Sequence, residues 1–79
     1  MSVQIRFLGI FKKFQPSDNG SGFWEVDGEG ETIEGILQPT GLLQSNIGYT
    51  PIVNGIRKPK SYVLCAGDKV NIMPLVAGG

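Results

Sequence analysis

The chain closes with Val70-Asn71-Ile72-Met73-Pro74-Leu75-Val76-Ala77-Gly78-Gly79, and this stretch decides the fold. Its first four residues are typical of a final strand, and Pro74 ends that strand because proline cannot donate to a sheet. Fully extended, residues 76–79 span about 13 Å at ~3.3 Å per residue. Glycine lacks a Cβ, so the last two residues can pass through a narrow channel. We therefore expect a strand followed by a tail that places its carboxylate in another protein's active site, although glycine is also common at termini without a function.

Patterning elsewhere predicts several further strands. Apolar residues alternate with polar ones from Val3 to Phe7 and again from Phe23 to Asp27, which indicates two half-buried strands joined as an antiparallel hairpin. Tyr49 to Val53 is predicted to be another strand, and Asn54-Gly55 favours a type I′ turn into a short strand at 56–57. The expected core consists of Val3, Ile5, Phe7, Trp24, Val26, Ile33, Leu37, Val53, Leu64, Val70 and Ile72.

One short helix is predicted between these strands. Thr32 is a suitable N-cap, and the apolar residues of Ile33–Leu37 have the spacing of one helix face. The helix should be short or distorted, because Gly35 lies inside it and Pro39 should push Gln38 out of the α region. Together the elements predict an α+β fold, a mixed sheet of four to five strands with one short helix packed on one face. We expect residues 1–75 to form a single domain and residues 76–79 to form its tail.

Composition excludes several kinds of function. The 79 residues suffice for one small domain, in which an enclosed substrate pocket would compete with the core for apolar side chains. Seven basic residues balance seven acidic ones, which argues against nucleic-acid binding. With no His and only Cys65, the chain has too few ligands for a zinc site and cannot form an internal disulfide. No apolar run suits a signal peptide or a membrane span, so we expect a cytoplasmic protein, monomeric when alone, without metal.

The C-terminal third of the chain resembles the ubiquitin-like β-grasp sulfur carriers of the MoaD/ThiS family. This family includes the small subunit of molybdopterin synthase and the thiamine-pathway carrier. The shared features are the Val53-Asn54-Gly55 hairpin, the turn Leu64-Cys65-Ala66-Gly67-Asp68-Lys69-Val70 into the last strand, and the stretch from Pro74 to Gly79. The first half matches only in its order of elements. The resemblance implies a β-grasp, in which the first and last strands run parallel and adjacent inside the sheet.

The resemblance also implies a mechanism and a set of partners. An E1-like adenylyltransferase would use ATP to adenylate the carboxylate of Gly79, with Gly78 beside it in the channel. A sulfur donor, such as a persulfide-bearing sulfurtransferase, would convert the acyl-adenylate to a thiocarboxylate. The sulfur would serve the large subunit of molybdopterin synthase, which Pro74 favours, or thiazole synthase, or the synthesis of another sulfur metabolite. The carrier would bind no cofactor and supply no catalytic side chain. Its partner-binding residues would be Pro74, Leu75, Val76 and Ala77.

Other features keep alternatives open. Arg57, Lys58 and Lys60 form a basic cluster that would orient a partner, although charge runs are usually solvated surface. A lone cysteine such as Cys65 is more often a small buried hydrophobe than a nucleophile. Lys12-Lys13 lies between aromatic residues, as in single-strand-binding strips, but the zero net charge argues against that function.

Two further functions compete with sulfur transport. A ubiquitin-like modifier would join the activated carboxylate of Gly79 to lysines of other proteins. A plain β-grasp binding module would make no use of its Gly-Gly end. Formation of a thiocarboxylate, formation of lysine conjugates and indifference to truncation separate the three.

Overall fold

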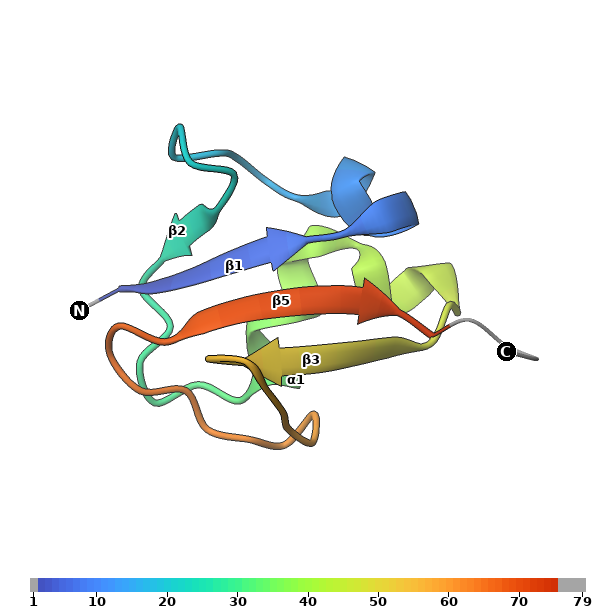
Figure 1. Cartoon of the computed structure of the whole chain (residues 1–79). Coiled ribbons are helices and arrows are strands. Elements are labelled where there is room, and N and C mark those ends of the chain that lie inside the picture. The colour runs from blue at the N-terminus through green and yellow to red at the C-terminus, as the bar shows by residue number, and fades with distance from the viewer. Residues whose placement is uncertain (1, 76–79) are drawn as a thin grey trace.

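A five-stranded mixed sheet forms the body of the protein in this computed structural model, which describes residues 2–75 (Figure 1). The predicted tail, residues 76–79, lies outside the described residues. The strands are β1 (Val3–Phe7), β2 (Trp24–Val26), β3 (Tyr49–Val53), β4 (Ile56–Arg57) and β5 (Lys69–Pro74). Their order across the sheet is β2-β1-β5-β3-β4. β1 and β5 are parallel and the other pairs antiparallel, so the predicted parallel pair inside the sheet is confirmed.

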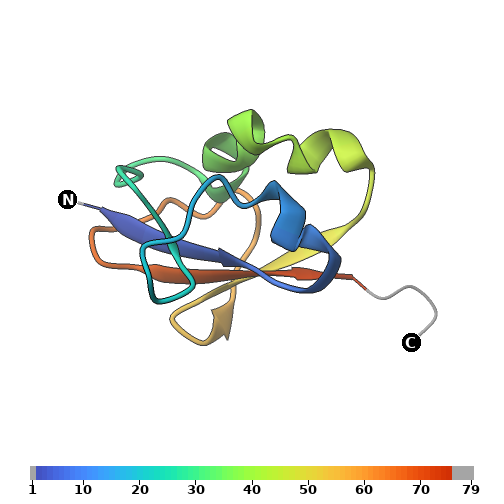
Figure 2. The ribbon, with the colours of Figure 1, turned by 90° about the horizontal axis from the view of Figure 1, so that it is seen from above.

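The core lies on one face of this sheet. Ile5 pairs with Val70 and Phe7 with Ile72, and none of the four side chains is more than 1% exposed. Figure 2 shows the helical segments over that face and the other face uncovered. Two predicted core residues, Trp24 and Val26, are only partly buried, because β2 is an edge strand. Four residues of the hydrophobic core were absent from the expected core: Phe11, Ile36, Leu42 and Tyr49.

The predicted helix forms as α1 (Ile33–Leu37) and continues into two 3₁₀ turns, η2 (Gln38–Thr40) and η3 (Leu42–Ser45). Thr32 caps it as predicted, since its hydroxyl oxygen accepts from the Gly35 amide at 3.0 Å. The expectation for Gln38 is wrong: it stays in the right-handed helical region, with φ −51° and ψ −49°. The chain tightens into η2 there, and Pro39 sits at the start of that turn, where a missing N–H costs little. None of the helices within residues 2–75 is long and apolar enough to cross a membrane.

A further 3₁₀ helix, η1 (Gly9–Phe14), follows β1 directly and was not predicted. Gly9 adopts a positive φ of 57°, which turns the chain away from the strand. The turn carries Phe11 into the core, where its side chain is fully buried. Residues 9–14 therefore cover one end of the sheet instead of extending it.

A buried carboxylate ties the β3–β4 turn to the start of β5. Asn54 and Gly55 have φ values of 51° and 84°, as the predicted type I′ turn requires. The carboxylate of Asp68, only 7% exposed, accepts from the Asn54 side-chain amide and from the Cys65 backbone amide, both at 2.9 Å. The Asn54 side-chain oxygen accepts in turn from the Lys69 amide at 3.0 Å. The two links of Asn54 join the β3–β4 turn to the start of β5, whereas the link from Cys65 closes the turn that precedes β5.

Replacing Asp68 by Ala should destabilise the domain strongly. The change leaves two part-buried donors without their acceptor, at a cost of about 2–3 kcal/mol in total. For a domain of this size the melting temperature should fall by roughly 10–20 °C. Asp27→Ala, at an exposed position, is the control, and thermal melts followed by circular dichroism measure both. Equal melting temperatures for the two variants would contradict a structural role for Asp68.

Candidate functional site: the end of the last strand

The end of β5 is flanked by two glycines from different loops. The backbone amide of Leu75, directly after Pro74, donates to the carbonyl oxygen of Gly48 at 2.9 Å. A Cβ built on Gly48 would lie 3.0 Å from Cδ1 of Leu75, and one built on Gly9 would lie 3.4 Å from Cγ of Pro74. The backbone on both sides therefore approaches the strand end closely. The last described residues are held in place at the point from which residues 76–79 continue.

Exposed apolar side chains surround this strand end. Leu75, predicted to contact a partner, is 51% exposed, and Met73 on β5 is 39% exposed. Sequence reasoning missed two others: Ile10, next to Gly9, is 57% exposed, and Ile47, next to Gly48, is 37% exposed. The sequence signal that could have indicated these two residues is an apolar residue directly next to a glycine in a turn. A partner that covered this strand end would bury these apolar side chains. The predicted contacts Val76 and Ala77, and the reactive Gly78 and Gly79, lie outside the described residues.

The predicted basic cluster is brought together beside the strand end. Arg57, Lys58 and Lys60 line one hollow of about 420 Å³ that also includes Tyr49. The ammonium group of Lys60 lies 4.7 Å from the centre of the Tyr49 ring, a cation–π distance. Because Tyr49 pairs with Pro74 across β3 and β5, this hollow adjoins the strand end. Its role in orienting a partner stays a prediction.

Tyr49 is itself unusual, because its hydroxyl group is buried without a hydrogen-bond partner among the described residues. The residue is only 4% exposed. Burial first, and the nearby carboxylate of Glu34 second, raise the pKa of Tyr49 above its ordinary value. The ring therefore stays neutral over the physiological range, as a platform for Lys60.

The structure also tests two other candidate sites from the sequence, Cys65 and the aromatic-basic strip around Lys12-Lys13. Cys65 is exposed, against the expectation of a small buried side chain, because it lies in a surface turn whose backbone amide binds Asp68. Phe11 is buried and packs on Phe14 at 6.3 Å between ring centres, so it is not available to stack on a base beside Lys12. Within residues 2–75, no three Cys, Asp or Glu side chains gather closely enough to hold a metal ion.

The sheet order, the parallel β1–β5 pair and the helix over one face define the ubiquitin-like β-grasp class. Among solved structures, the chain is similar to the crystal structure of SAMP1 from Haloferax volcanii, with a TM-score of 0.68. The two share 20% sequence identity over 100% of both chains, a likeness that shows the fold. No model of a known protein family matches the chain, and no curated protein sequence matches it either.

Replacing Tyr49 by Phe should raise stability instead of lowering it. The buried hydroxyl costs free energy without a hydrogen bond in return, so its removal should gain up to about 1 kcal/mol. The sign of the pH effect follows from the raised pKa. Below pH 10, the ordinary Tyr pKa, the tyrosine is neutral in the folded and the unfolded chain; above it the unfolded chain loses the proton first, and stability falls.

Thermal melts of both proteins at pH 7 and between pH 10 and 11 measure these effects. We expect Tyr49→Phe to melt higher at pH 7, with the difference growing above pH 10. A lower melting temperature at pH 7 would show that the hydroxyl has a hydrogen-bond partner, and parallel losses above pH 10 would show that the pKa of Tyr49 is not raised.

Proposed function

We propose that this β-grasp protein is a sulfur carrier whose C-terminal Gly79 is adenylated and then converted to a thiocarboxylate. One observation carries the proposal: β5, paired on both sides within the sheet, ends at Pro74 among exposed apolar residues, directly ahead of Val76-Ala77-Gly78-Gly79. The β-grasp fold and its likeness to SAMP1 support the ubiquitin-like character. The resemblance of the last strand and tail to known sulfur carriers supports the chemistry.

The chemistry requires activation because a carboxylate is a poor acyl donor. An oxygen of the Gly79 carboxylate attacks the α-phosphorus of ATP, and pyrophosphate leaves. The terminal sulfur of the persulfide donor then attacks the acyl carbon, and AMP leaves an acyl disulfide behind. A thiol of the donor or of the activating enzyme attacks the donor-side sulfur, forms a disulfide with it and releases the thiocarboxylate. The carrier supplies the reacting carboxylate and its partners supply the catalytic groups, so it works as a partner subunit and not as an enzyme.

The partners follow from the same chemistry. An E1-like adenylyltransferase would enclose the tail and cover Leu75 and its apolar neighbours, since a few apolar residues usually dominate such contacts. The hollow lined by Arg57, Lys58 and Lys60 would orient that enzyme through its charge. A persulfide-bearing sulfurtransferase would supply the sulfur. The large subunit of molybdopterin synthase is the proposed recipient, with thiazole synthase as the alternative.

Deleting Gly79 should abolish thiocarboxylate formation and leave the fold intact. The deletion moves the carboxylate back by ~3.3–3.6 Å, whereas about 1 Å of misplacement already costs ~100-fold in rate. Gly78→Val should have the same effect by blocking a channel shaped for glycine. Intact mass after incubation with a cognate activating enzyme, ATP and a sulfur donor gives the readout, alongside a thermal melt.

Ser21→Val, in an exposed loop, is the control for added bulk. A sulfur atom on the truncated chain would show that Gly79 is not the sulfur-bearing residue. Conjugates to lysines without thiocarboxylate would assign the modifier function instead. If no variant differed from the unchanged chain in this reaction, the remaining function would be that of a binding module.

A further inference from the structure

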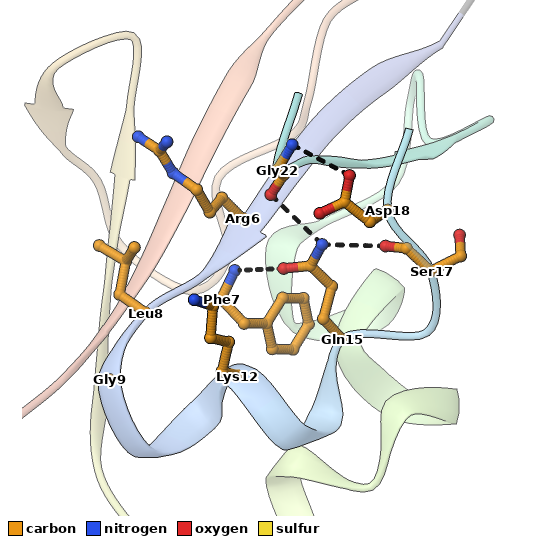
Figure 3. Close-up of a pocket in the computed structure, with 9 residues that line it drawn as sticks. All are labelled: Arg6, Phe7, Leu8, Gly9, Lys12, Gln15, Ser17, Asp18 and Gly22. Atoms are coloured by element: carbon orange, nitrogen blue, oxygen red, sulfur yellow. Dashed lines mark hydrogen bonds between the residues drawn. The ribbon is translucent and has the colours of Figure 1, made fainter. Parts of the chain in front are cut away.

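A second hollow lies between β1, η1 and the loop that precedes β2. It has a volume of about 660 Å³, within the range of protein binding sites. Figure 3 shows the side chain of Gln15 between Phe7 and the loop, with Arg6 and Lys12 toward one side and Asp18 toward the other. The sequence patterns that predicted the fold did not point to this hollow.

Gln15 creates the hollow by taking the place of a strand residue. β1 and β2 pair up to Ile5 and Trp24, and the same register would next pair Phe7 with Gly22. Instead, the side-chain oxygen of Gln15 accepts from the Phe7 amide at 3.0 Å. Its side-chain nitrogen donates to the carbonyl oxygens of Gly22 at 3.3 Å and Ser17 at 2.9 Å. The inserted side-chain amide satisfies the backbone hydrogen-bonding groups of β1 on one side and of the loop on the other, and it holds the loop away from β1.

The charges of the hollow are unbalanced. Arg6 donates from Nε to the side-chain oxygen of Asn71 at 3.0 Å and lies 4.7 Å above the Phe23 ring, which fixes the guanidinium in position. No carboxylate among residues 2–75 pairs with Arg6 or Lys12. The one acidic residue that lines the hollow, Asp18, accepts from the amides of Gly20 and Gly22 through its Oδ1. Two cations and one carboxylate therefore line the hollow, and neither cation is paired with that carboxylate.

The surroundings favour a protein segment over a small anion as the ligand. Leu8 lines the hollow together with the two cations, and Ile10, two residues further along the chain, is exposed. A free anion would contact the cations alone, whereas a peptide can place carboxylates on the cations and an apolar side chain on Leu8. Gly9 lines the hollow and lies close to Pro74, since a Cβ built on it would be 3.4 Å from Cγ of Pro74, so a bound segment would lie beside the end of β5.

We infer that the hollow between Arg6 and Lys12 binds an acidic segment of a partner protein. Carboxylates of Asp or Glu side chains accept from the guanidinium of Arg6 and from the ammonium of Lys12, and apolar neighbours pack on Leu8. Charge-assisted contacts of this kind give orientation and a salt-dependent affinity. The site rests on the charges and shape of residues 6–22 and does not depend on any reaction of Gly79.

The test is a titration of the ¹⁵N-labelled full chain, followed by amide chemical shifts. The probes are a capped peptide of alternating glutamate and leucine, the same peptide with glutamine for glutamate, and inorganic phosphate. We expect saturable shifts at Phe7, Lys12, Gln15 and Gly22 with the acidic peptide only, weakened by 0.5 M salt because added ions screen exposed charges beyond about 4–5 Å.

Lys12→Glu should weaken binding of the acidic peptide at least about tenfold, which corresponds to ~1.4 kcal/mol. Lys13→Glu is the matched control, because it changes net charge equally while Lys13 lies over the Phe14 ring and does not line the hollow. Well-dispersed spectra of both variants confirm folding. Equal weakening by the two variants, equal binding of phosphate, or no saturable shift would each overturn the inference; none of these outcomes bears on the sulfur chemistry.

Discussion

The parallel pairing of β1 with β5 is the constraint on which the rest of this structure depends. The register that joins Ile5 to Val70 and Phe7 to Ile72 buries four apolar side chains in one layer. It also brings the first and last strands together in one sheet, so the residues between them must connect the end of β1 to the start of β5. Because β5 lies inside the sheet, its end meets loops on both sides, and Gly9 and Gly48 are small enough to permit that approach. The site at the strand end is a consequence of this topology.

The same topology distributes charge in a way that the net value conceals. One hollow with Arg57, Lys58 and Lys60 lies along β3, and another with Arg6 and Lys12 lies along β1. β5 runs between these two strands, so its end is flanked by positive charge on either side. Five of the seven acidic residues are in the segment 25–34, and of these Glu34 lies beside Tyr49 and Lys60. A chain with zero net charge can thus present a local potential that steers an acidic partner toward one end.

Two buried polar groups illustrate different energetic outcomes in one small core. Asp68 is buried with its two oxygens accepting from Asn54 and Cys65, so its desolvation is offset and it joins the β3–β4 turn to the turn before β5. The hydroxyl of Tyr49 is buried without a partner among the described residues, and its desolvation is not offset. The ring beneath it supports Lys60 at the edge of the basic hollow. One group therefore stabilises the fold, whereas the other lowers stability at the candidate site.

Local patterns in the sequence determined the strands, the Thr32 cap and the Asn54-Gly55 turn, because each depends on neighbouring residues and backbone preference. The family resemblance added the parallel strand pair, which no local pattern contains. Only the tertiary structure decided that Phe11 enters the core, that Cys65 is exposed and that Gln15 separates Phe7 from its loop. These outcomes depend on contacts between segments that sequence periodicity does not relate to one another. A side-chain amide that replaces a strand pairing leaves no periodic trace, and neither does a hollow between two elements.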